Sequence, residues 1–222
     1  NKMSIFEIMG PAMIGPSSSH TAGAARIGRM ARLLFADKID RAVVKLHGSF
    51  ADTAVGHGTD RAIIGGLLGF LPDDQRLRSS FELAEKEGME FSLEEVKLRE
   101  VHPNTAKIEL YNKEKDKSLE IVASSIGGGR IKVTEINGSP VELTGRMPTL
   151  WILHHDRPGE VGIITSILGS YKINIAFMQV YRNRKGDIGS CIIEMDHKPN
   201  QYVIKHLENN EDIIQVRYLP RI

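Results

Sequence analysis

The spacing of apolar residues changes several times along the chain, and each change predicts an element. Apolar residues recur at helical spacing over 21–36 and 61–69, and a polar helix is predicted over 78–88. A short helix is expected over 49–56, and residues 89–98 are expected to lead into a strand or to form an edge. In the first part of the chain, strands are predicted at 42–48, 106–111, 118–125, 129–136 and 141–143.

The pattern stops at 144–148, a segment that contains Gly145 and Pro148 and is predicted to be a linker. After it come a strand, a helix, two strands, a helix and a strand, predicted at 149–154, 159–171, 175–181, 189–195, 199–209 and 213–218. This βαββαβ order is typical of a ferredoxin-like unit. The sequence therefore predicts an α+β protein, with an N-terminal α+β domain over 3–143 and a ferredoxin-like domain over 149–222.

Composition and charge narrow the classes of function. The 222 residues are 41% hydrophobic and 26% charged, and the net charge of +1 gives no strong attraction to nucleic acid or to a membrane. No apolar run is long enough to span a bilayer, and no secretory signal is expected. The single cysteine, Cys191, cannot form an internal disulfide, so a reducing, cytoplasmic location is expected. One thiol also cannot hold an iron–sulfur cluster, so this chain alone is expected to bind no metal.

Polar motifs carry the candidate chemistry of the first domain, namely SSSHT at 17–21, GHGTD at 56–60, HPNT at 102–105 and SIGGG at 125–129. The first motif follows a segment, 4–9, that is expected to form a short helix or strand and to end in a Gly10-Pro11 turn. It places four hydroxyls and one imidazole just before a helix, where backbone N–H groups are unpaired. This arrangement favours a small anionic, polar ligand.

The C-terminal domain carries a second recognisable pattern, LWILHHDRPGEVG at 150–162, which resembles the ACT domain signature. In that family a strand ends in a D-x-P-G turn that opens the first helix. The residues that match the signature, or the entry to the second strand, are Asp156, Pro158, Gly159, Gly162, Asn174 and Ile175. The resemblance implies a regulatory unit that pairs sheet to sheet, giving a homodimer, and binds an amino acid at the interface. A pure dimerisation element is the alternative.

The motifs GPSSSHTAG, HGSFADTAVGHGTD, HPNT and SIGGG, in this order, resemble the β subunit of bacterial iron–sulfur L-serine dehydratase. With the ACT unit the resemblance covers 3–222. It implies a lyase that converts L-serine to pyruvate and ammonia and uses a [4Fe–4S] cluster as a Lewis acid on the substrate hydroxyl. The cluster cysteines belong to the α part in this family. The resemblance therefore implies an α subunit that carries the cluster, with the active site completed between the two chains.

The implied reaction removes an α-proton, and it therefore needs a general base with a pKa near neutrality. His57, which lies between two glycines ahead of a helix, is the first candidate, and His20 is the second. Residues expected to bind the substrate are Ser17, Ser18, Ser19, Thr21, Gly58, Thr59, Asp60, Asn104, Thr105, Gly127 and Gly128. Thr59 or Asp60 also suits the N-cap of the following helix, and His57 could merely hold its loop.

Two other functions fit the same motifs. A related domain in some D-3-phosphoglycerate dehydrogenases is regulatory, so the first domain could hold L-serine for allosteric control without catalysis. A hydrolase could use the triple serine with His20, but adjacent Ser and His on one turn point apart and no acid partner is evident. Arg26, Arg29 and Arg32 are interpreted as a solvated helix face, with Arg26 as the exception because it is close to the serines.

Overall fold

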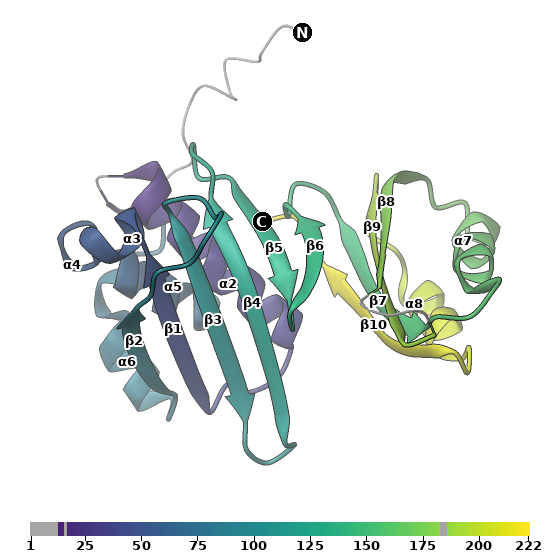
Figure 1. Cartoon of the computed structure of the whole chain (residues 1–222), viewed down its shortest axis with the longest axis horizontal. Coiled ribbons are helices and arrows are strands. Elements are labelled where there is room, and N and C mark those ends of the chain that lie inside the picture. The colour runs from purple at the N-terminus through teal and green to yellow at the C-terminus, as the bar shows by residue number, and fades with distance from the viewer. Residues whose placement is uncertain (1–12, 16, 183–185) are drawn as a thin grey trace, which may run out of the picture. The chain divides into compact units, whose positions relative to one another are not determined.

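The computed structural model describes residues 13–15, 17–182 and 186–222. The element expected at 4–9 and the Gly10-Pro11 turn lie outside these residues, as does Pro16 of the serine-rich motif. The chain divides into two compact units, one up to Gly138 and one from Ser139 to Ile222 (Figure 1). No helix among the described residues is long and apolar enough to cross a membrane.

The first unit is built on a mixed sheet. Its strands are β1 (Arg41–His47), β2 (Glu90–Glu95), β3 (Thr105–Asn112), β4 (Lys117–Ser125) and β5 (Ile131–Ile136), in the order β2-β1-β3-β4-β5. β1 pairs with β2 in parallel, while β1–β3, β3–β4 and β4–β5 are antiparallel. The register aligns His47 with Thr105 and Thr105 with Ser124, so β1 and β4 end where β3 begins.

Helices form the second layer of this unit, and those from α3 to α6 connect the parallel strands β1 and β2 (Figure 1). They are a π-helix (Ser18–Gly23, η1), α2 (Ala24–Phe35), α3 (Ser49–Asp52), α4 (Ala54–His57), α5 (Thr59–Leu67), a 3-10 helix (Gln75–Ser79, η2) and α6 (Ser80–Lys86). Glycines let α2 and α5 approach closely. A Cβ at Gly28 would come closer than 3.0 Å to the carbonyl oxygen of Ile63, and one at Gly66 would do the same to that of Ala25. Backbone contact between two helices requires residues without side chains at these points.

The helical predictions need three corrections. The predicted helix over 21–36 begins instead with the π-helix, and the one over 49–56 consists of the two short helices α3 and α4. Neither Thr59 nor Asp60 caps α5. Its N-cap is Gly58, at φ 65°, and no side chain donates or accepts there. The side chain of Asp60 instead accepts the N–H of the next residue, Arg61.

The arginines of α2 do not form a purely solvated face. Arg32 Nη1 donates to Leu67 O at 2.8 Å and Arg29 Nη1 donates to Gly69 O at 3.5 Å, so both contact carbonyls at the end of α5. The last carbonyls of a helix have no partner within the helix, and cationic side chains stabilise that end. Arg26, expected to be an exception because it is close to the serines, contacts the SIGGG motif, where its Nη1 donates to Gly129 O at 2.6 Å.

The second unit has the predicted ferredoxin-like topology. After β6 (Ser139–Leu143) come β7 (Thr149–His155), α7 (Glu160–Ser170), β8 (Ile175–Arg182), β9 (Ile188–Met195), α8 (Gln201–Glu208) and β10 (Ile213–Leu219). The sheet order is β10-β7-β9-β8, and all three pairs are antiparallel. One face of the sheet packs against both helices through a core that includes Leu150, Ile152, Leu168, Ile193 and Leu207. The α+β class predicted from the sequence is confirmed.

Candidate functional site

The serine-rich motif begins the candidate site. Ser17 is the N-cap of η1, and its Oγ accepts the backbone N–H of His20 at 3.2 Å. The same oxygen lies 3.2 Å from Nδ1 of the His20 ring. The expectation that adjacent serine and histidine side chains point apart does not cover this pair, because Ser17 and His20 are three residues apart and meet across one turn. Among the described residues, no acid side chain hydrogen-bonds to the pair.

The His20 ring gathers residues from the segment after β1. Its Nε2 lies 2.9 Å from Ser49 Oγ, and its ring meets those of Phe50 and His57 edge to face, with centroids 5.6 and 5.0 Å apart. We call Ser17, His20, Ser49, Phe50 and His57 the histidine cluster. The two histidines proposed as the base thus lie together, although the sequence separates them by 37 positions.

The HPNT and SIGGG motifs lie close to one another and to the serine-rich motif. Ser125 N donates to Asn104 O at 2.9 Å, which joins the HPNT and SIGGG segments. A Cβ at Gly23, the last residue of η1, would clash with the side chain of Ser125. A Cβ at Gly48 would lie 2.8 Å from Pro103 O. All four motifs therefore converge where β1 and β4 end and β3 begins, near η1 and α3 (Figure 1).

Three polar atoms of these motifs are buried and make no hydrogen bond within the structure. They are His57 Nδ1, Thr59 Oγ1 and Ser125 Oγ. Thr59 and Ser125 are fully buried. Buried polar groups in folded proteins are nearly always paired, so three unpaired ones in one region suggest contact with a bound molecule. None of the other predicted site residues has such an atom in the described part of the chain.

Burial changes the titration of two groups at the site. The pKa of His20 is lowered, mainly by burial and then by the neighbouring His57, while a hydrogen bond to the backbone of Ser49 acts in the opposite direction. A neutral His20 ring is therefore favoured. Burial raises the pKa of Asp60, and the N–H of Arg61 offsets this only in part. Both effects indicate a site that is partly shielded from water.

The predicted binding residues differ in how directly they contact the histidine cluster. Thr21 Oγ1 donates to His57 O at 3.3 Å, and Thr105 is buried, with its Oγ1 2.7 Å from Ser124 Oγ. Ser18 and Ser19 lie half-buried in η1. Gly58 caps α5, and Gly127 and Gly128 have positive φ angles in the loop after β4, at 92° and 60°.

His57 differs from the sequence expectation, since it ends the short helix α4 and does not directly begin a helix. Sequence reasoning also gave no role to Ser49 or Phe50, and it named Ser125 only as part of a motif. Ser49 follows Gly48, whose φ of 55° is a left-handed conformation that favours glycine. The glycine at the end of the predicted strand was the feature of the sequence that could have drawn attention to Ser49.

The chain's residues do not fit an iron–sulfur cluster. The one thiol, Cys191, is fully buried in β9 of the second unit, where burial raises its pKa to about 12, and its Sγ lies 3.4 Å from His154 Nε2. A thiolate ligand needs the opposite environment. Among the described residues, no group of three or more His, Cys, Asp or Glu side chains is placed to hold a metal ion.

The ACT-type residues of the second unit surround the start of α7. Asp156 accepts from Gly186 N and from Arg182 Nη1, each at 3.0 Å, and these bonds keep the pKa of its half-buried carboxyl low. Gly159 is the N-cap of α7, with φ 94°, and a Cβ at Gly162 would meet nothing. Pro158 is exposed in the turn between the two. Near the start of β8, Asn174 precedes Ile175 and donates to Asp196 at 2.7 Å.

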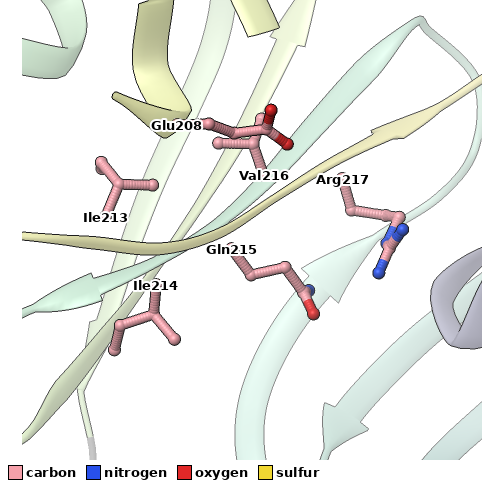
Figure 2. A pocket seen from close by; sticks show the side chains of 6 residues that line it. All are labelled: Glu208, Ile213, Ile214, Gln215, Val216 and Arg217. Carbon is pink, nitrogen blue, oxygen red and sulfur yellow. The ribbon is translucent and has the colours of Figure 1, made fainter. Parts of the chain in front are cut away.

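A pocket of about 280 Å³ lies elsewhere in this unit, along β10 (Figure 2). It is lined by Glu208, Ile213, Ile214, Gln215, Val216 and Arg217. Gln215 and Arg217 extend to the same side of the strand in Figure 2, and each has a buried nitrogen without a hydrogen bond. None of the residues that line this pocket was predicted to bind a ligand.

Comparison with known proteins places this site in a family. The family described as "Serine dehydratase beta chain" matches residues 4–135. The "Probable L-serine dehydratase, beta chain" of Bacillus subtilis is 43% identical over 213 residues, which cover 96% of each chain. The "L-serine dehydratase, beta chain" of Peptoniphilus asaccharolyticus is 39% identical over 87% of each chain. The chain therefore belongs to the serine dehydratase beta chain family. As predicted, it is a subunit of an L-serine dehydratase, and the name of a beta chain implies an alpha partner.

More limited similarities extend to other proteins. The D-3-phosphoglycerate dehydrogenase of Synechocystis is 27% identical over 161 residues, which are 72% of this chain but only 28% of that enzyme. Among solved structures, the ACT domain from GTP pyrophosphokinase of Chlorobium tepidum matches 32% of this chain and 95% of its own length. It is 20% identical, with a TM-score of 0.29. The ferredoxin-like topology of the second unit rests on its own strand order.

Proposed function

We propose that this chain binds L-serine and removes its α-proton in an iron–sulfur L-serine ammonia-lyase, which forms pyruvate and ammonia. The observation that carries the proposal is the set of buried, unpaired atoms of His57, Thr59 and Ser125 within the four converging motifs. Serine offers a carboxylate, an ammonium group and a hydroxyl. Hydroxyl and imidazole side chains can bind all three. The beta chain family and its relatives in Bacillus and Peptoniphilus support this substrate.

His57 is the better candidate for the base. A base needs a ring nitrogen with a free lone pair, and His57 Nδ1 makes no hydrogen bond in the structure. Both ring nitrogens of His20 instead lie within hydrogen-bond distance of hydroxyls. In the proposed reaction His57 takes the α-proton and the β-hydroxyl leaves, which gives an enamine. Tautomerisation and hydrolysis of this enamine release ammonia and pyruvate. Because this chain offers no cluster ligands, the [4Fe–4S] cluster is proposed to lie on the α subunit.

The test is reconstitution with the α subunit under anaerobic conditions, with serine-dependent pyruvate formation as the readout. Omission of this chain should abolish activity, and full activity without it would refute a shared site. In the complex, His57→Ala should lower kcat by about 10²–10⁴-fold, the usual contribution of a general base. His197→Ala, which removes an exposed histidine of the second unit, is the matched control and should have no effect.

The allosteric alternative retains one observation in its favour, namely the similarity to D-3-phosphoglycerate dehydrogenases. In that case the first unit holds L-serine without acting on it. The same His57→Ala variant separates the two functions. An unchanged kcat with a shifted dependence on serine concentration would support the allosteric module and refute the base assignment.

We also propose that the second unit makes the chain a homodimer and serves in regulation. Its edge strand β8 carries two exposed apolar side chains, Phe177 and Val180, which are 47% and 48% exposed. Exposed apolar residues on an edge strand favour pairing with another chain. Light scattering should give the mass of a dimer, and Phe177→Lys should shift it toward the monomer. A monomeric wild-type chain would refute the proposal.

A further inference from the structure

The His20 imidazole lies between two serine hydroxyls that come from different elements. Ser17 Oγ is 3.2 Å from Nδ1, and Ser49 Oγ is 2.9 Å from Nε2. A neutral imidazole has one N–H donor and one acceptor nitrogen. One hydroxyl must therefore donate to the ring while the other accepts from it, and the ring tautomer decides which hydroxyl does which.

The contacts of Ser17 indicate the tautomer. Its Oγ already accepts the backbone N–H of His20, so its own hydrogen is available for Nδ1. If Nδ1 accepts from Ser17, the proton of the neutral ring lies on Nε2, which is 2.9 Å from Ser49 Oγ. The geometry therefore favours a ring protonated at Nε2, with Nδ1 as the acceptor.

We propose that Ser17, His20 and Ser49 form a hydrogen-bond relay of fixed direction, and that its last member, the Ser49 hydroxyl, binds the substrate carboxylate. In this direction Ser49 Oγ accepts from His20 Nε2, so its hydrogen needs another acceptor. Within the described part of the chain Ser49 Oγ makes no other hydrogen bond. Each bond of such a chain polarises the next, and a polarised hydroxyl at the end donates best to an anion.

The backbone holds Ser49 firmly at this place. It follows Gly48, which is packed against Pro103 of the HPNT motif, and it begins α3. Thr53 Oγ1 donates to the carbonyl oxygen of Ser49 at 2.6 Å. The ring of Phe50 fixes the adjoining edge of His20. Ser49 thus has a fixed backbone and a hydroxyl oxygen that lies 2.9 Å from His20 Nε2, which suits a group that orients a ligand.

The identity of the ligand in this inference rests on the proposed function. The relay also gives the two histidines different roles. With Nε2 protonated and Nδ1 hydrogen-bonded, His20 has no free lone pair and acts as a positioning residue. His57, whose ring meets that of His20 at 5.0 Å between centroids, keeps an unpaired Nδ1 for proton transfer.

The kinetic test uses Ser49→Ala in the anaerobic complex with the α subunit. A hydrogen bond to a charged group contributes enough to binding for its loss to raise KM for L-serine roughly tenfold, whereas kcat should change less than about threefold. Inhibition by L-alanine, which keeps the carboxylate, should weaken to the same extent, and inhibition by L-alaninamide should not change. Ser118→Ala, which removes an exposed hydroxyl of β4, is the matched control. Equal loss of both inhibitors would overturn the carboxylate assignment.

The direction of the relay has its own test, which needs no activity. The ¹⁵N chemical shifts of the His20 ring in the full chain identify the protonated nitrogen. We expect Nε2–H in the wild type and in Ser118→Ala, and a mixture of tautomers in Ser17→Ala. A ring protonated at Nδ1 in the wild type would refute the relay. If His57→Ala is inactive while Ser49→Ala behaves like Ser118→Ala, the relay fails and the proposed function stands.

Discussion

At the scale of single residues, Asp60 gives a prediction about pH. Burial raises its pKa, so the folded chain holds the carboxyl proton more tightly than the unfolded chain does. The stabilising effect of this proton is complete below the ordinary value of 3.8 and is lost as the pH rises through the raised value. Asparagine has the same shape, can still accept from Arg61 N and has no charge. We therefore expect Asp60→Asn to be more stable than the wild type above this window.

Urea unfolding of the full chain between pH 4 and pH 8 measures this effect. The difference in free energy of unfolding between Asp60→Asn and the wild type should grow with pH and then level off. Asp73→Asn, which neutralises an exposed carboxylate, should follow the wild-type profile. Parallel profiles for all three chains would contradict the assignment. Since Asp60 is predicted to bind the substrate, the more stable variant should also be less active.

The residues of the site were only partly predictable from the sequence. Ser17, His20 and His57 stand in motifs whose composition indicates polar chemistry, so they could be named in advance. The contact between His20 and Ser49 depends on how β1 and η1 meet in space, and no local pattern encodes such a meeting. The same holds for Ser125, which lies against the first motif only because Gly23 has no side chain and leaves room for the side chain of Ser125.

At the scale of elements, the close packing of α2 against α5 is the feature most open to test. A Cβ at Gly28 would meet the backbone carbonyl of Ile63, which cannot rotate away as a side chain could. Forcing such a contact apart costs about 1–3 kcal/mol in ordinary cores. We expect Gly28→Ala to lower the free energy of unfolding by at least this amount, although alanine is the better helix former.

A matched substitution isolates the packing effect. Gly169 also lies inside a helix, α7, but a Cβ there would meet no atom within 4 Å. Gly169→Ala should therefore stabilise the chain, by up to about 1 kcal/mol from helix propensity alone. Equilibrium unfolding by circular dichroism measures both variants. If Gly28→Ala were as stable as Gly169→Ala, the close approach of α2 and α5 would be refuted.

Elements were easiest to predict where the spacing of apolar residues stayed constant over a segment and turn residues stood at both ends of that segment. In the second unit the Asp156–Gly159 turn and the alternating strands gave the type and order of every element. In the first unit the π-helix Ser18–Gly23 was missed, because six residues are little more than one turn and show no period of their own. The parallel pairing of β2 with β1 was also missed, since pairing direction depends on the path of the intervening helices.

At the scale of the whole molecule, the polar groups of the candidate site and the one thiol of the chain lie in different units. It supplies hydroxyls, imidazoles and a carboxyl at the converging motifs, but its one thiol is buried in the other unit. A thiol with a pKa of about 12 carries almost no thiolate at neutral pH and is resistant to oxidation. This chain should therefore tolerate oxygen, whereas a partner that holds an exposed cluster should not.

The tolerance to oxygen can be tested by exposing one chain at a time. This chain is held in air, returned to anaerobic conditions and mixed with the untreated α subunit, and pyruvate formation is measured. We expect full activity, because none of the groups proposed for the site reacts with oxygen, and we expect loss of activity when the α subunit is exposed instead. Iodoacetamide should label Cys191 only in urea, which checks that the thiol stays buried during exposure. Loss of activity after exposure of this chain alone would show that it supplies an oxygen-sensitive group, contrary to the proposed division between subunits.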